Sequence, residues 1–142
     1  MNKYIKKLKG NAAENQACRY LKKQGYKILE RNFTCKTGEI DLIAYDKQYH
    51  EIVFVEVRFR LSGIDDAIAS VNYPKQLKIT RAAKYYLLLN PELADSFTRF
   101  DLIAISSDQN KKLIIKHIPD AFRTWINPAI FHQNHFQDNP SS

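Results

Sequence analysis

The sequence predicts an α/β domain whose mixed central β-sheet is flanked by helices. Two observations lead to this prediction. Apolar residues recur at helical spacing near the start and in the middle of the chain, and five short stretches rich in β-branched and aromatic residues lie between and after these segments. The resulting order, α-β-β-β-α-β-β, fits neither a helix bundle nor a β-sandwich. The 142 residues are enough for one such domain and too few for two ordinary ones.

The first predicted helix covers residues 10–25. Asn11 can cap its start, apolar side chains recur at helical spacing after it, and Gly25 suits the position just past the last turn. Three strands follow, and a turn at Thr37-Gly38 separates the first two. These strands cover residues 26–33, 39–45 and 52–59.

The second half of the chain begins with residues 62–73, whose pattern predicts a loop with a helical turn. Pro74 then begins a helix over residues 75–89, which Asn90 and Pro91 end. Two further strands cover residues 99–105 and 113–118. We therefore divide the chain into a basic N-terminal extension (1–9), an α/β domain (10–123) and an irregular tail interrupted by prolines (124–142).

Positive charge is concentrated at the start of the chain. The sequence has 22 basic and 15 acidic side chains, a net charge of +7, and residues 1–38 hold ten of the basic and two of the acidic ones. Such an excess favours binding to a polyanion or an acidic surface. No apolar stretch approaches the roughly 20 residues of a membrane-spanning helix, and the N-terminus lacks the apolar core of a secretory signal. We expect a cytoplasmic protein without a membrane partner.

Acidic residues interrupt two of the predicted strands. Because strand side chains alternate between faces, we expect Glu39, Asp41 and Ile43 on one face and Ile40 and Leu42 on the other. In the next strand, the charged side chains share one face with an apolar neighbour. These residues are Phe54, Glu56, Arg58 and Arg60.

A hairpin that closes with Asp46 opposite Glu51 sets Asp41 opposite Glu56. Opposed carboxylates destabilise a sheet unless a cation or a proton separates them. Magnesium binds oxygen ligands, usually with one or two protein carboxylates. Asp41 and Glu56 are therefore candidate metal ligands, and the neighbouring Arg58 is placed to hold a phosphate oxygen.

A second interpretation of these residues stays open. They can form a solvated sheet face on which Glu39, opposite Arg58 in the same register, makes an ordinary ion pair. Asp101 is expected to form a buried ion pair with Arg99, or to order the sheet, rather than to bind metal. The pair His132 and His135 has metal-ligand spacing but no third ligand, and is expected to be incidental.

Five motifs follow one another in order along the chain. They are G-x-x-A-E-x-x-A-x-x-Y-L from Gly10, G-E-I-D-L-I-A from Gly38, F-V-E-V-R-x-R from Phe54, Lys75-Gln76, and R-F-D from Arg99. With these motifs the chain resembles the YraN family over residues 10–123. That family is similar to archaeal Holliday-junction resolvases and to the wider PD-(D/E)xK nuclease superfamily.

The resemblance implies a restriction-endonuclease-like core in which Asp41 and Glu56 bind Mg²⁺, or Mn²⁺ in its place. It adds Glu14, from the first helix, to the metal-binding acids, and it makes these three carboxylates and Arg58 the catalytic residues. Asn11-x-x-Glu14 also has the spacing of a capping box, and this alternative stays open. The superfamily has Lys where this chain has Arg58. Because Arg keeps its proton, it can orient a phosphate but cannot act as a general base.

We therefore expect a metal-dependent endonuclease that hydrolyses phosphodiester bonds in branched or flapped DNA. The residues expected to bind DNA are Lys6, Lys7, Lys9, Arg60, Lys75, Gln76 and Lys78. The cations of helix 75–89 form either a phosphate-facing strip or the solvated side of an amphipathic helix. Two other classes stay open: a non-catalytic nucleic-acid-binding module with the nuclease-like fold, and an adaptor whose basic segment meets an acidic protein. Resemblance to dimeric resolvases also implies a two-fold homodimer.

Overall fold

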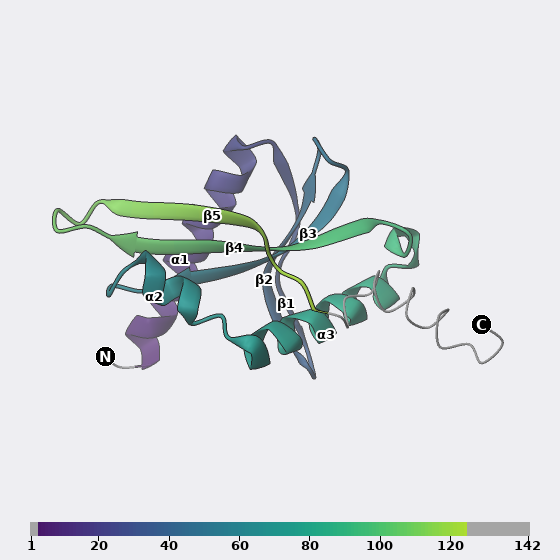
Figure 1. Ribbon diagram of the computed structural model, residues 1–142, viewed down its shortest axis with the longest axis horizontal. Coiled ribbons are helices and arrows are strands. Elements are labelled where there is room, and N and C mark those ends of the chain that lie inside the picture. Colours follow the sequence, from purple (N-terminus) through teal and green to yellow (C-terminus); the bar gives the residue numbers. More distant parts are fainter. Residues whose placement is uncertain (1–2, 125–142) are drawn as a thin grey trace.

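Five strands form one mixed sheet, as the sequence predicts (Figure 1). The computed structural model describes residues 3–124, and for residues 3–9 it describes the backbone alone. The strands lie side by side in chain order; β3 and β4 are parallel, and the other neighbouring pairs are antiparallel. They are β1 (Tyr26–Cys35), β2 (Gly38–Asp46), β3 (Glu51–Phe59), β4 (Phe97–Ser107) and β5 (Leu113–Phe122).

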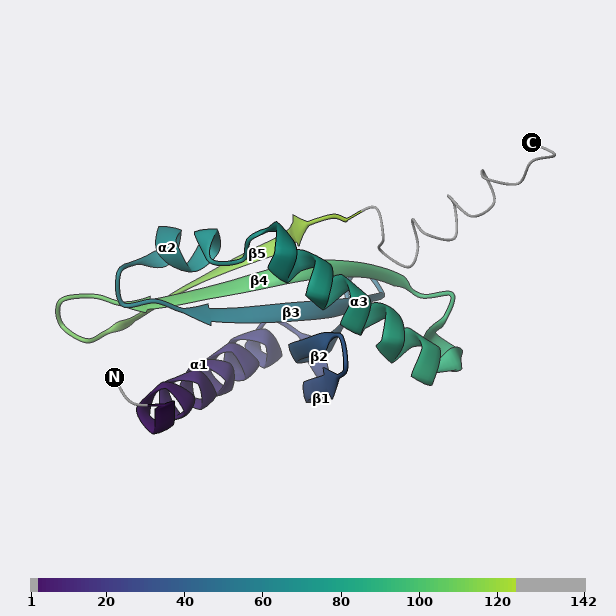
Figure 2. The ribbon, with the colours of Figure 1, turned by 90° about the horizontal axis from the view of Figure 1, so that it is seen from below.

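Helices cover both faces of the sheet. The first, α1 (Lys3–Lys23), packs on one face, whereas α2 (Ile64–Ala69) and α3 (Tyr73–Leu89) form the crossover from β3 to β4 and cover the other face. Figure 2 shows α1 and α2 on opposite sides of the strands. A short 3₁₀ helix, η1 (Pro91–Leu93), follows α3. None of the helices in the described residues has the length and apolar character needed to cross a bilayer.

The predicted start of the first helix at residue 10 is wrong, because α1 begins at Lys3. Residues 3–9 favour a helix, and one Gly inside a helix costs only about 1 kcal/mol relative to Ala. Gly10 therefore lies within the helix instead of at its start. The predicted end is confirmed: Gly25 follows the last turn with a φ of 93°, where a residue without Cβ is favoured.

Two hydrophobic cores hold the layers together. On one side of the sheet, Phe54 and Phe100 pack with Tyr86 of α3. On the other side, small residues of α1 such as Ala17 pack against the valines of β3. Because both faces of β3 are covered, all of its residues 52–57 are buried. A carboxylate within that run is consequently removed from water together with its apolar neighbours.

The register of β2 on β3 is the predicted one, since the ladder runs from Asp46 opposite Glu51 to Leu42 opposite Val55. The predicted face of Ile40 is wrong. Ile40 packs in the core under α3, whereas Leu42 packs in the core under α1. Regular alternation would place two residues of this spacing on the same face. The β2 strand therefore departs from regular alternation between these two residues.

The departure occurs at Asp41 and at Asn32, which lies across from it on β1. Asn32 has a φ of 54°, a left-handed conformation that Asn adopts more readily than most residues. On either side of Asn32, Arg31 reaches α1 and donates to Asn15 at 2.6 Å, whereas Phe33 packs under α3. The hairpin thus changes its faces here, and this change positions the side chain of Asp41.

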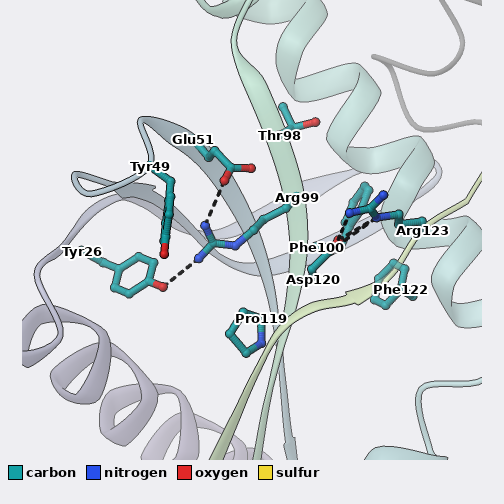
Figure 3. Close-up of a pocket in the computed structure, with 10 residues that line it drawn as sticks. All are labelled: Tyr26, Tyr49, Glu51, Thr98, Arg99, Phe100, Pro119, Asp120, Phe122 and Arg123. Atoms are coloured by element: carbon teal, nitrogen blue, oxygen red, sulfur yellow. Dashed lines mark hydrogen bonds and ion pairs between the residues drawn. The ribbon is translucent and has the colours of Figure 1, made fainter.

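A buried ion-pair network joins the strands near the start of β3 and β4. Arg99 donates to both carboxylate oxygens of Asp101 at 2.9 and 3.1 Å, which confirms the predicted pair. It also donates to Asp46 at 2.7 Å and to the Tyr26 hydroxyl at 2.7 Å, and it lies 3.5 Å from Glu51. Figure 3 shows Arg99 between Tyr26 and Glu51. These three residues line a cavity of about 460 Å³. All five N–H groups of Arg99 are used within this network.

The network predicts a loss of stability in acid. Burial acts to raise the pKa of Asp101, but hydrogen bonds from His117 and Arg99 outweigh it and hold that pKa below its usual value. The pKa of Asp46 is also lowered, because Arg99 and two backbone N–H groups outweigh burial. A lowered carboxyl pKa contributes stability that is present above the unfolded value of about 3.9 and lost as pH falls through the folded value.

We therefore expect the urea midpoint of unfolding to fall steeply as pH drops below about 4. In Asp101→Asn, the midpoint at neutral pH should be lower and the slope below pH 4 shallower, because one of the titrating groups is gone. Denaturation curves from pH 7 to pH 2.5 test this. Identical acid slopes in the two proteins would contradict the assignment of this pH dependence to the network.

Candidate active site

Asp41 and Glu56 bring two carboxyl groups together on neighbouring strands. Glu56 belongs to the buried run of β3 and is only 4% exposed. The side chain of Asp41 reaches β3, where its Oδ2 accepts a hydrogen bond of 2.8 Å from the backbone N–H of Val57. This side chain therefore fixes β2 to β3 just beyond the pair Leu42–Val55. Asp41 is held beside the residue that follows Glu56.

Two cations lie against the buried carboxylate. Arg58 Nε is 3.2 Å from Glu56 Oε1, and Lys75 Nζ, in the first turn of α3, is 3.9 Å from the same oxygen. The alternative in which Arg58 pairs with Glu39 is wrong, because exposed Glu39 lies opposite Thr34 of β1 and Arg58 pairs with Glu56. The buried Nε of Arg58 has no hydrogen-bond partner of good geometry among the described residues.

Burial is the largest cause of the shifted pKa values at this site. Burial and the charge of Asp41 raise the pKa of Glu56 to about 8, with Lys75 and Arg58 acting in the opposite direction. Burial also raises the pKa of Asp41, which the hydrogen bond from Val57 partly offsets. Two adjacent carboxyl groups that resist ionisation form a site that gains from a bound cation or a shared proton.

Glu14 lies on α1 and interacts electrostatically with the same site. Its pKa is raised by burial and then by the charge of Asp41, and its Oε2 is buried without a hydrogen-bond partner among the described residues. The capping-box alternative is wrong: because α1 begins at Lys3, Asn11 and Glu14 lie inside the helix. Within residues 3–124, no three His, Cys, Asp or Glu side chains gather closely enough to hold one ion together.

The other predicted DNA-binding residues have separate positions. Gln76 donates to the carbonyl oxygen of Val71 at 3.0 Å and so holds the connection between α2 and α3. Arg60 is half-buried and donates to the carbonyl oxygen of Phe59 at 2.8 Å, whereas Lys78 is exposed on α3. Among the members of this set whose side chains the structure describes, Lys75 is the one in contact with a carboxylate of the site. The side chains of Lys6, Lys7, Lys9, His132 and His135 lie outside the described residues, as does the tail from residue 125.

Sequence reasoning missed Asn32. Its side chain acts to lower the pKa of Glu14, and its left-handed backbone lies across from Asp41. The available signal was an Asn inside a predicted strand. Asn is disfavoured in strands and enriched in the left-handed region, so it marks a point where regular strand geometry ends.

The model of the uncharacterised protein family UPF0102 matches residues 13–105 of the chain. The chain belongs to this family. UPF0102 is the YraN family, so the predicted family is confirmed. UPF0102 proteins of Clostridium acetobutylicum and Desulforamulus reducens are 45% and 41% identical to this chain over 121 and 120 residues. These matches cover 84% and 82% of this chain and 97% and 96% of the relatives.

The matched span holds the whole two-carboxylate site. Glu14, Asp41, Glu56, Arg58 and Lys75 all lie between residues 13 and 105. A UPF0102 protein of Nitrosococcus oceani is a further relative, 40% identical over 116 residues that cover 81% of this chain and 91% of the relative. The site therefore belongs to the segment that characterises the family.

Proposed function

We propose that this protein is a metal-dependent DNA endonuclease with a PD-(D/E)xK core, which hydrolyses phosphodiester bonds in branched or flapped DNA. The observation that carries the proposal is the pair of adjacent, shielded carboxyl groups, Asp41 and Glu56, flanked by the cations Arg58 and Lys75. A carboxylate whose pKa is raised to about 8 by burial and a like charge is typical of a functional site. A purely structural sheet position would gain stability from an apolar residue instead.

The residues fit a magnesium ion. Asp41 and Glu56 supply oxygen ligands from two strands, and Mg²⁺ usually combines one or two carboxylates with waters and substrate phosphate. Glu14, with its unpartnered buried oxygen, is available to contact a water of such an ion. When bound, the ion supplies a nucleophilic water and neutralises charge on the phosphate. Mn²⁺ has the same ligand preference and is the expected substitute.

Neighbouring groups of the protein orient the carboxylate of Asp41 and place positive charge beside the proposed metal site. The N–H of Val57 fixes the carboxylate of Asp41 towards β3. Arg58 stabilises negative charge on the phosphate, because a guanidinium serves as a donor to phosphate oxygens and not as a general base. Lys75 places a second positive charge at the start of α3. The excess of basic residues in 1–38 provides an electrostatic approach surface for DNA.

A second candidate is a non-catalytic DNA-binding module with the same fold. One observation favours it: Arg58 and Lys75 already balance the charge of Glu56, so the folded protein does not require an ion for electrostatic reasons. In this case binding to DNA would not depend on divalent ions, and the two carboxyl groups would take no part in it.

The experiment is a cleavage assay with flap, four-way-junction and linear duplex DNA in Mg²⁺, Mn²⁺ or EDTA. We expect cleavage of a branched substrate with either ion and none with EDTA. The double variant Asp41→Ala/Glu56→Ala should be inactive. Absence of cleavage of every substrate, or unchanged cleavage by the double variant, would overturn the proposal. Metal-independent binding without cleavage would favour the second candidate.

The role of Arg58 can be tested separately. We expect Arg58→Ala to lower the single-turnover rate constant of cleavage by roughly 10²-fold, because it removes the positive charge that lies beside the reacting phosphate. Arg58→Lys should stay within about tenfold of the wild type, because it keeps that charge. Single-turnover cleavage of a flap substrate measures both variants. Wild-type rates for Arg58→Ala would contradict a role in charge stabilisation.

A further inference from the structure

A hollow of about 710 Å³ lies between the β1–β2 turn and the outer face of α3. The turn contributes Cys35 and Lys36. The helix contributes Arg81, Lys84, Tyr85 and Leu88. The described residues that line the hollow include three cations and no carboxylate. Its electrostatic character is therefore complementary to a polyanion.

The walls of the hollow are held in place by close packing. Gly38, at the end of the turn, has a φ of 151°, and a Cβ built there would lie 3.3 Å from the carbonyl oxygen of Lys78. A larger residue would push the turn away from α3. The ring of Tyr85 lies 6.3 Å from that of Phe33, which is buried in the core. The hollow is thus formed by rigid elements and not by a loose loop.

The hollow also presents an aromatic face to solvent. Tyr85 is 45% exposed and Leu88 is 69% exposed, so an aromatic ring and an apolar side chain lie open to solvent beside the three cations. Proteins that hold single-stranded nucleic acid combine such aromatic platforms with cations that follow the phosphate backbone. Bases within a duplex are stacked on their neighbours and offer no free ring face. The combination therefore favours an unpaired strand over a duplex.

We propose that this hollow binds an unpaired nucleotide in the single-stranded arm of the DNA substrate, with its base stacked on Tyr85 and its phosphates near Lys36, Arg81 and Lys84. The inference rests on the proposed function and specifies its substrate class. It adds a binding site that none of the five sequence motifs contains.

The distance between the hollow and the two carboxylates sets a minimum length for the single-stranded arm of the DNA. Tyr85 follows Lys75 by ten residues on α3, which is about 15 Å along the helix axis. At the duplex rise of about 3.4 Å per nucleotide of one strand, this distance corresponds to roughly four nucleotides, and an extended unpaired strand covers it with fewer. A strand with a phosphate at Asp41 and Glu56 reaches Tyr85 only if its unpaired arm spans this distance.

The test is fluorescence anisotropy of the full chain with labelled flap DNA in EDTA, so that binding is measured without cleavage. Arms of 2 and 10 nucleotides are compared, with both 5′ and 3′ polarity. Tyr85→Ala should weaken binding of the 10-nucleotide arm of at least one polarity about tenfold and that of the 2-nucleotide arm less than twofold. Tyr85→Phe should restore wild-type binding. Arg81→Ala/Lys84→Ala should reduce the dependence of affinity on salt.

Matched controls are Tyr49→Ala, an exposed tyrosine beyond the other end of β2, and Lys27→Ala/Lys116→Ala on the two edge strands. Each should leave the difference between long and short arms unchanged. Equal losses for both arm lengths, no loss in Tyr85→Ala, or the same loss in Tyr49→Ala would overturn the inference.

The failure of this inference can be distinguished from failure of the proposed function. Asp41→Asn should lose cleavage in Mg²⁺ and keep the arm-dependent binding. If the wild type cleaves DNA but Tyr85→Ala binds as the wild type does, the hollow is not a binding site and the proposed nuclease function stands. Arm-dependent binding through Tyr85 without cleavage of any substrate would reject the nuclease and support the hollow as a single-strand site.

Discussion

Glu56→Gln is expected to lower cleavage by roughly 10²–10³-fold or more while making the folded protein more stable. The loss follows because the amide is a poor ligand for a hard cation, and Asp41 alone then remains on this pair of strands. The gain follows from burial. Glutamine keeps the size of the side chain and removes the charge that the interior disfavours.

The stability gain has a definite pH dependence. The pKa of Glu56 is raised from its usual value to about 8 by burial and by Asp41. A raised carboxyl pKa means that the folded state binds more protons than the unfolded chain between those two values, so wild-type stability falls as pH rises towards about 8. The difference in Tm between Glu56→Gln and the wild type should therefore grow from pH 5 to pH 8 and then level off.

Thermal unfolding without divalent ions measures the expected gain of stability in Glu56→Gln. Cleavage of flap DNA measures the expected loss of activity. Glu51→Gln is a suitable control, since Glu51 lies on the same strand and is partly exposed. It should leave cleavage unchanged. Retention of cleavage within tenfold in Glu56→Gln, or a lower Tm at pH 8, would contradict the proposed site.

Arg99→Leu is expected to cause the largest loss of stability, about 3–5 kcal/mol. Its guanidinium is the hydrogen-bond donor shared by Asp46, Asp101 and Tyr26, and two of these are buried carboxylates. Removing the cation leaves their charges without compensation in the interior. The penalty is far larger than the net contribution of an exposed pair.

The matched control for that variant is Arg123→Leu. Arg123 forms an ion pair of 2.6 Å with Asp120, but its side chain is 75% exposed. We expect a change far smaller than that of Arg99→Leu, because solvent screens such a pair. Urea denaturation at pH 7 measures both variants. Equal losses in the two would show that burial does not set the importance of the Arg99 network.

The sequence was informative where the pattern is local. The register of β2 on β3 follows from a short hairpin and the alternation of apolar residues, and it is confirmed from Leu42 to Asp46. Beyond Leu42 the same reasoning places Ile40 on the wrong face, since a single left-handed residue at Asn32 accompanies a change of face in both strands. Periodicity describes regular strands, and it carries no information about where regularity ends.

Contacts between residues far apart in the chain were the least predictable. The pair Arg99–Asp101 is close in sequence and was predicted, but its partners Tyr26 and Asp46 come from other strands. The ion pair of Lys75 with Glu56 depends on how α3 crosses the sheet, which no local pattern specifies. The sequence pattern therefore predicted the two carboxylates of the site, but it did not predict which cations lie against them.

The proposed function requires that Asp41 and Glu56 together bind a divalent cation. Its most direct test is titration of the purified protein with Mn²⁺, followed by electron paramagnetic resonance of the free ion, for the wild type, Asp41→Asn, Glu56→Gln and the control Glu51→Gln. We predict one bound ion per chain in the wild type and the control, and its loss in both site variants. Equal numbers of bound ions in all four proteins, or no binding by the wild type, would contradict the claim.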